Sequence, residues 1–143
     1  MKYFYSIEQI AALRQQVEAL ALDVPDGFYS LTLRKLQKFC NGCGAEYFPA
    51  IVRDALSAYS ERYAPAFMAH DTDYEFGTDR ATADRRMLKN MWKIFRHHFG
   101  FWWFANKSAI LELFLIIIPA YLAVRIGGGK AHAEAQQQKG GVS

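Results

Sequence analysis

Apolar residues recur every three or four positions along most of the chain, which is the spacing of one face of a helix. The first stripe begins at Ile10 and follows Ser6, which has Gln9 three residues after it. A serine followed at this distance by glutamine is a capping-box pattern, so we expect a helix to start there. It should end near Asp23, because the turn residues V-P-D-G occupy 24–27.

The same spacing predicts further helices over 28–39, 49–63, 66–76, 78–99 and 109–126. Pro65 suits the first turn of the fourth helix, where its missing N–H is not needed, and Gly77 suits the end of that helix. We find no repeat and no convincing strand pattern. The sequence therefore predicts an all-α protein in which two antiparallel helices meet across Gly77, and an apolar helix lies at the C-terminal end.

Composition indicates one domain. The chain has 143 residues, of which 52% are hydrophobic and 15% aromatic, so it can bury a core. We expect residues 1–127 to form this helical domain. The polar, glycine- and glutamine-rich segment 128–143 is typical of a disordered tail.

Charge and cysteine content narrow the partners and the compartment. The formal net charge is +3 and the basic residues are scattered, which argues against nucleic acid and is compatible with anionic lipid. The two cysteines are Cys40 and Cys43, too close together to staple a domain, so we expect a reducing compartment. The first residues lack the apolar core of a signal peptide. These features predict a cytoplasmic or membrane-associated protein.

Two segments near the C-terminal end suit a lipid interface. Residues 89–104 mix basic and aromatic side chains, which anchor proteins at headgroups but also occur where aromatics form a core. Residues 113–124 are an uninterrupted apolar run between Glu112 and Arg125, with Pro119 inside it. The run is shorter than the roughly 20 residues of a spanning helix. A buried or interfacial helix and a membrane span over 109–126 are both open.

The stretch H-D-T-D-Y at 70–74 carries the candidate chemistry. His70 and Tyr74 are four residues apart and share a helix face, whereas Asp71 points about 100° away from His70. A neutral imidazole is a good general base near pH 7 when a carboxylate holds its other nitrogen. Asp84 on the following helix is a candidate for that carboxylate if the two helices pack antiparallel, and the Tyr74 hydroxyl would then donate to it.

Asp71 has a different candidate role. A carboxylate together with backbone carbonyls of a glycine-rich loop is the ligand set that calcium prefers. C-N-G-C-G at 40–44 is such a loop. A calcium ion at this place would polarise an ester carbonyl and stabilise the oxyanion that develops from it.

The combination of C-N-G-C-G at 40–44, H-D-T-D-Y at 70–74 and A-D at 83–84 resembles the phospholipase A2 superfamily. It is nearer to the disulfide-poor bacterial, phage and parvoviral members than to the venom and pancreatic enzymes. The resemblance covers roughly residues 39–95. It implies a hydrolase that cleaves an acyl ester of a glycerophospholipid at a membrane surface.

By this resemblance His70 is the base that activates water, and Tyr74 and Asp84 orient it. Phe67 and Met68 would line the acyl slot.

The resemblance also implies a calcium site. Asp71 would supply the carboxylate, and Cys40, Gly42 and Gly44 would supply backbone carbonyls. Cys40 stands where the secreted enzymes have an aromatic residue at the head of the loop. This departure favours an alternative function, a catalytically inactive membrane-associated or virion protein that keeps the fold.

Other interpretations of these residues predict different chemistry. Cys40 and Cys43 form a C-x-x-C pair, but no βαβ pattern flanks it, which argues against a redox motif. One such pair with the distant His97 and His98 is not a zinc signature. A His-Asp phosphohydrolase needs a histidine before His70, and the chain has none there.

The remaining interpretation assigns no catalytic or metal-binding role to the aspartates. Asp71, Asp73 and Asp79 would be solvated, and Asp84 would cap a helix.

Overall fold

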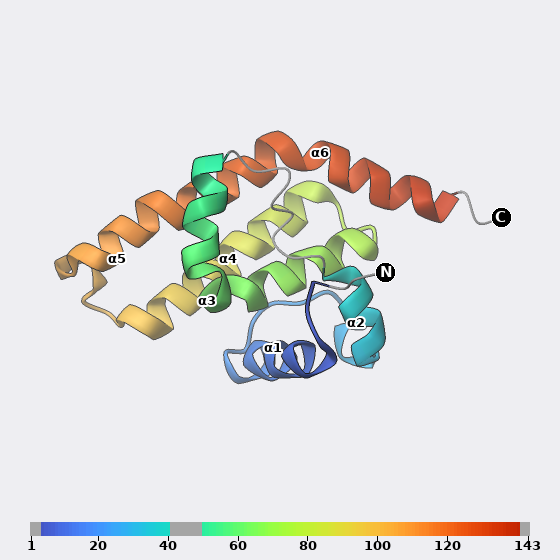
Figure 1. Ribbon diagram of the computed structural model, residues 1–143, viewed down its shortest axis with the longest axis horizontal. Helices are drawn as coiled ribbons and strands as arrows, with labels where there is room; N and C mark the ends of the chain where they lie inside the picture. Colours follow the sequence, from blue (N-terminus) through green and yellow to red (C-terminus); the bar gives the residue numbers. More distant parts are fainter. Residues whose placement is uncertain (1–3, 41–49, 141–143) are drawn as a thin grey trace.

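The computed structural model describes residues 4–40 and 50–140, and every regular element in these residues is a helix (Figure 1). This confirms the all-α class. The elements are α1 (Ile7–Ala19), η1 (Phe28–Ser30), α2 (Leu33–Phe39), α3 (Ala50–Glu75), α4 (Arg80–Phe99), η3 (Trp103–Ala105), α5 (Lys107–Glu112), η4 (Leu113–Ile117) and α6 (Ile118–Gly140).

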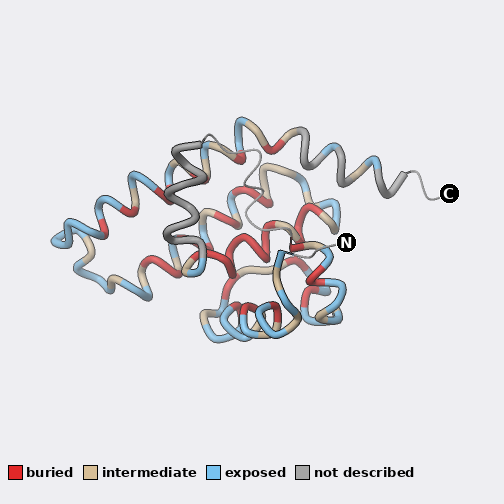
Figure 2. The backbone as a smooth tube through the Cα atoms, viewed as in Figure 1, coloured by how far each residue is buried: buried red, intermediate tan, exposed pale blue. Residues whose placement is uncertain are grey.

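The helices form three layers. α3 and α4 pack against each other in the middle, α1 and α2 contact α3 on one side, and η4 and α6 contact both central helices on the other (Figure 1). Figure 2 shows that buried positions gather on α3 and α4, whereas the outer face of α5 is largely exposed. The largest buried side chains include Tyr63, Met87, Met91 and Phe95. The central pair of helices therefore supplies a large share of the core.

The N-terminal helix begins as its capping pattern predicts. Ser6 accepts a hydrogen bond from the backbone of Gln9, and the Gln9 side chain accepts one from the backbone of Ser6. The helix ends earlier than predicted, at Ala19, and Ala21 has a left-handed φ of 47°. The segment 28–39, expected as one helix, is divided into η1 and α2 by Thr32, whose side chain caps α2.

The predicted boundary at Pro65 is wrong, because α3 runs as one helix of 26 residues through the proline. A proline inside a helix removes one backbone hydrogen bond and costs about 3 kcal/mol. Burial offsets this cost here, since Tyr63 and Ala66 on either side of the proline are fully buried. Glu61, one turn before the proline, is exposed.

The turn between α3 and α4 follows the predicted chemistry. Gly77 has a φ of 73°, and the amides of Gly77 and Thr78 donate to the carbonyls of Tyr74 and Asp73. These two bonds form a Schellman motif, which ends α3. Asp79 then accepts hydrogen bonds from the first amides of α4 and caps it. The short turn brings α4 back along α3, which is the predicted antiparallel arrangement.

The apolar segment near the C-terminal end forms an almost continuous rod of α5, η4 and α6 (Figure 1). η4 is a turn of π-helix that ends two residues before Pro119. A proline ring clashes with the carbonyl four residues earlier. A wider π-helical turn at that position accommodates the proline without breaking the rod.

Residues 128–140 differ from the prediction of a disordered tail, because α6 continues to Gly140. Most of the residues from Lys130 to Lys139 are good helix formers. The tail also has tertiary contacts, since Gln136 Nε2 donates to the carbonyl of Tyr74 at 3.2 Å. Helical propensity and contacts with α3 together favour a folded segment over a free one.

Candidate functional site

His70 and Asp84 face each other across the two central helices. His70 Nε2 lies 2.9 Å from Asp84 Oδ1, and the Asp84 side chain is fully buried. This is the pairing that the antiparallel arrangement predicts. Because Nε2 faces the carboxylate, Nδ1 is the ring nitrogen that remains to take a proton.

Tyr74 completes the contacts of the same carboxylate oxygen. Its hydroxyl donates to Asp84 Oδ1 at 3.1 Å, and its ring lies against the imidazole of His70 with centroids 4.3 Å apart. Burial and the negative charge of Asp84 both raise the pKa of the Tyr74 hydroxyl, so it stays a hydrogen-bond donor. The imidazole is thus held by a carboxylate on one edge and by an aromatic ring on one face.

Two arginines contact the other oxygen of Asp84. Arg125 Nη1 donates to Oδ2 at 3.2 Å, and Arg80 Nε lies 3.8 Å from the same atom. Burial by itself favours the neutral acid, but hydrogen bonds from His70, Tyr74 and Arg125 outweigh it and lower the pKa of Asp84 below its ordinary value. Asp84 is therefore a carboxylate with donors on both oxygens.

Asp71 and Cys40, two of the residues expected to bind calcium, are close enough for the charge of Asp71 to act on the Cys40 thiol. Cys40 ends α2 and is buried, and the pKa of its thiol is raised by burial first and by the charge of Asp71 second. Asp71 itself is only partly buried. Gly42 and Gly44, the other expected ligands, lie outside the described residues. Within the described residues no cluster of three metal-ligating side chains occurs.

The raised pKa of Cys40 also bears on the redox interpretation. A buried thiol without a positive neighbour stays protonated and is a poor nucleophile. This describes Cys40 alone, because Cys43 lies outside the described residues.

The other aspartates of the segment have structural roles. Asp73, expected as a solvated residue, is fully buried and pairs with Arg86 and with the Thr78 hydroxyl. Asp79 is exposed and caps α4. The interpretation that assigned no catalytic site had given this capping role to Asp84. Asp84 is not a cap.

Phe67 and Met68 are the residues expected to line an acyl slot. Both are almost fully buried and belong to the hydrophobic core. The slot stays a prediction, because a helix face that is apolar on both sides of His70 can pack against the core or against a ligand with the same spacing.

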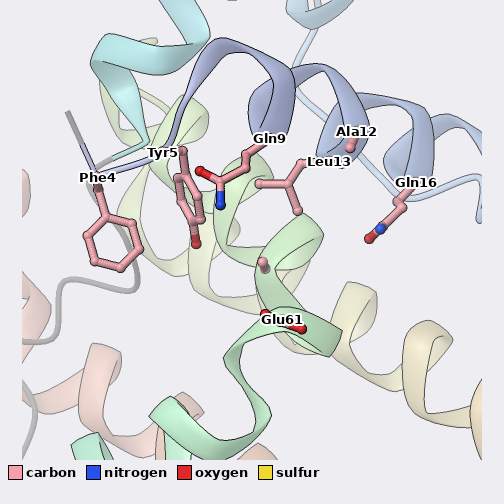
Figure 3. Close-up of a pocket in the computed structure, with 8 residues that line it drawn as sticks. Phe4, Tyr5, Gln9, Ala12, Leu13, Gln16 and Glu61 are labelled. Atoms are coloured by element: carbon pink, nitrogen blue, oxygen red, sulfur yellow. The ribbon is translucent and has the colours of Figure 1, made fainter.

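A pocket of about 370 Å³ lies between α1 and the middle of α3 (Figure 3). Its walls combine apolar with amide side chains and one carboxylate: Phe4, Tyr5, Gln9, Ala12, Leu13, Gln16, Glu61 and Ala64. It contains neither His70 nor Asp84. With a single carboxylate and no base beside it, this pocket lacks a catalytic set of its own.

The C-terminal rod and the segment 101–104 before it expose large apolar side chains, which together we call the apolar face. Its side chains are at least one-third exposed: Phe101, Trp102, Phe104, Ile110, Leu111, Phe114, Leu115, Ile118, Leu122 and Ile126. Trp102 and Ile126 are 70% and 84% exposed. Large exposed apolar patches are typical of sites of interaction with a protein or a membrane.

The segment Lys107–Gly129 is long and apolar enough to cross a membrane by length and composition. Its other side packs on the domain through Ile116, Ile117 and Ala120. Glu112, which the sequence left as a charge inside an apolar helix, is buried and paired with Arg62 at 2.5 Å and with the Tyr63 hydroxyl. The same helix thus has one face against the core and one face without a partner among the described residues.

Sequence reasoning missed the arginines around Asp84. Arg125 follows the apolar run, and a charge at that place in an apolar helix indicates that its side chain has a polar partner. Nothing in the sequence showed that the partner is Asp84, which lies 41 residues earlier.

Comparison of the chain with protein-family models, with curated proteins and with solved structures gave no match.

Proposed function

We propose that this protein is a calcium-dependent phospholipase A2-like hydrolase that cleaves an acyl ester of glycerophospholipids. The observation that carries the proposal is the buried His70–Asp84 pair with Tyr74 on the same carboxylate oxygen. The sequence motifs at 70–74 and 83–84 that resemble the phospholipase A2 superfamily supply these three residues.

The geometry suits activation of a water molecule by His70. Nδ1 takes the proton from water as the oxygen attacks the ester carbonyl, and the proton then leaves with the departing alcohol. Asp84 stabilises the imidazolium that forms in between, and Tyr74 holds the carboxylate in place. Because Asp84 and Tyr74 fix the ring, His70 does not have to be reoriented at each turnover.

Calcium fits the donors near His70. Asp71 supplies a carboxylate, and the carbonyl of Cys40 lies at the C-terminal end of α2, where the helix dipole favours a cation. Gly42 and Gly44 would provide the other oxygens. When bound, the ion polarises the ester carbonyl and stabilises the negative charge that develops on its oxygen.

The apolar face supports a phospholipid membrane as the partner. We propose that α5 and α6 lie at the membrane surface with this face in the lipid. Spanning would require Glu112 and Arg125 to leave Arg62 and Asp84, their partners in the domain, for the apolar phase. Arg96 and Lys107 flank the exposed aromatics at 101–104 and suit contact with anionic headgroups.

Fatty-acid release from mixed phosphatidylglycerol and phosphatidylcholine vesicles tests the proposal. The purified protein should release fatty acid with calcium and not with a chelator. Release of equal amounts in both conditions would contradict the role of calcium. No release from a protein that is folded by circular dichroism would contradict the enzymatic proposal.

The second candidate function is that of an inactive membrane-associated protein with the same fold. Burial of His70, of which 6% is exposed, is the observation that favours it, because an active base must reach water. This candidate predicts vesicle binding through the apolar face with no release of fatty acid.

A further inference from the structure

The backbone of α6 passes directly over the polar site. A Cβ atom added to Gly128 would lie 2.8 Å from the hydroxyl oxygen of Tyr74, closer than side chains approach each other in proteins. A Cβ atom on Gly129 would lie 3.1 Å from Arg80 Nη1. The absence of side chains at these two positions lets α6 approach Tyr74 and Arg80 this closely.

Arg80 fastens α6 at this point. Its Nη2 donates to the carbonyl of Val124 at 3.1 Å and also to the carbonyl of Arg125. Both carbonyls belong to the turn of α6 that carries the Arg125 side chain. Arg80 therefore fixes the backbone from which Arg125 reaches Asp84.

His70 and Arg125 form hydrogen bonds with different oxygens of the Asp84 carboxylate. Oδ1 accepts from His70 and Tyr74 on α3, and Oδ2 accepts from Arg125 on α6. A carboxylate with donors on both oxygens cannot rotate without losing a bond. The charge of the arginine also favours the ionised form of Asp84.

We propose that Arg125 is a positioning residue for the His70–Asp84 pair, and that the site is complete only when α6 lies across Tyr74. This inference rests on the proposed function, because it gives His70 the role of the base. Arg125 touches neither substrate nor the reacting atoms and acts through Asp84. The helix that presents the apolar face to lipid thereby also completes the polar site.

Nuclear magnetic resonance of the His70 ring tests the inference without relying on activity. Long-range proton–nitrogen correlation at about pH 9, where an imidazole is neutral, shows which ring nitrogen carries the proton. The spectrum of His70→Asn identifies the signals. In the wild type the proton should lie on Nε2, facing Asp84, and in Arg125→Gln a substantial fraction should move to Nδ1.

Arg85→Gln is the matched control. Arg85 is exposed and follows Asp84 in the sequence, but its side chain donates to the Thr82 hydroxyl. Its replacement by glutamine removes one positive charge, as Arg125→Gln does. This variant should keep the wild-type tautomer. Arg125→Lys keeps the charge without the planar guanidinium and should restore part of the Nε2 form.

Hydrolysis gives a second readout. A hydrogen bond to a charged group corresponds to about a tenfold change in an equilibrium constant, so kcat of Arg125→Gln should fall about tenfold while KM changes little. A tautomer and a kcat equal to those of Arg85→Gln would overturn the inference. If the wild type hydrolyses nothing, the proposed function fails, but the tautomer still decides the role of Arg125.

Gly128→Val tests the close packing of α6 on Tyr74 without altering a charge. The valine would collide with the Tyr74 hydroxyl, so this variant should shift the His70 tautomer as Arg125→Gln does. Ile126→Val, at an exposed position of the same helix, is its control. A wild-type tautomer in folded Gly128→Val would show that α6 can move away without affecting His70, and would contradict the inference.

Discussion

His70 and Tyr74, one helical turn apart on α3, share a single oxygen atom of Asp84 on α4. The distances to Oδ1 are 2.9 Å from His70 Nε2 and 3.1 Å from the Tyr74 hydroxyl. Both contacts come from one face of one helix, and both end on a carboxylate that is fully buried. This arrangement distinguishes His70 from a histidine that packs only against apolar side chains.

Replacement of Asp84 by asparagine should impair orientation of His70 more than folding. The amide keeps the volume and can still accept from His70 or Tyr74, but it cannot stabilise an imidazolium. We expect kcat to fall about 100-fold, because the lost interaction with the charged imidazolium is worth about 3 kcal/mol and each tenfold change corresponds to about 1.4 kcal/mol. Fatty-acid release measured beside circular dichroism checks this, and an unchanged kcat would contradict it.

Stability should decrease in acid because of Asp84. Its folded pKa is lowered, so the folded state binds this proton less readily than the unfolded state. The contribution of Asp84 to the free energy of unfolding is present above the unfolded pKa, which is near 4 for an aspartate. It is lost as the pH falls through the folded pKa. Urea denaturation between about pH 6 and pH 3 should show a steeper loss of stability for the wild type than for Asp84→Asn. Parallel curves would contradict this.

The pair of Glu112 with Arg62 should hold the C-terminal rod on the domain. Glu112 is 4% exposed and also accepts from the Tyr63 hydroxyl. Glu112→Ala leaves Arg62 and Tyr63 without their acceptor and should lower the free energy of unfolding by about 2–3 kcal/mol. Glu18→Ala, an exposed residue of α1, should have a much smaller effect in the same denaturation experiment. Equal effects of the two changes would show that the buried pair adds no stability.

Aromatic side chains at the end of the apolar face should govern membrane binding. Trp102 and Phe104 are 70% and 51% exposed. Burial of a large apolar side chain is worth about 1.5–3 kcal/mol, so Trp102→Ala should weaken partition into phosphatidylglycerol vesicles about tenfold or more. Phe4→Ala removes a side chain that is 66% exposed beside the pocket at α1, and is the control. Equal partition of the two variants in a flotation assay would contradict membrane contact through this face.

Calcium binding should depend on Asp71. We expect Asp71→Asn to weaken calcium at least about tenfold, because an amide oxygen replaces a charged one. Calcium titration by calorimetry checks this, with Asp26→Asn, near the start of η1, as the control. Equal affinities of both variants would exclude Asp71 as a ligand.

Local sequence features predicted the elements that local chemistry determines. Ser6 and Gln9 identified the start of α1, and Gly77 identified the end of α3. The His70–Asp84 pairing followed from the same turn, since a short connection brings two antiparallel helices into register. Each of these features needs residues close together in the sequence.

The errors arose where distant contacts outweigh local preference. The helix through Pro65 depends on burial against elements far along the chain. The helical segment 128–140 is stabilised partly by the hydrogen bond to the Tyr74 carbonyl. The role of Arg125 depends on its hydrogen bond to Asp84. Spacing along the sequence cannot show such contacts, because they join residues that are more than 40 positions apart.

The most direct test of the central claim compares wild type and His70→Asn on the same phosphatidylglycerol vesicles with calcium. Asparagine keeps a polar side chain that can donate to Asp84, so the variant should fold, as its thermal unfolding will show. We expect fatty-acid release by the wild type and at least about a 100-fold lower rate for the variant, since general-base catalysis contributes about 10²–10⁴-fold. Equal release by the two proteins would show that His70 is not the base.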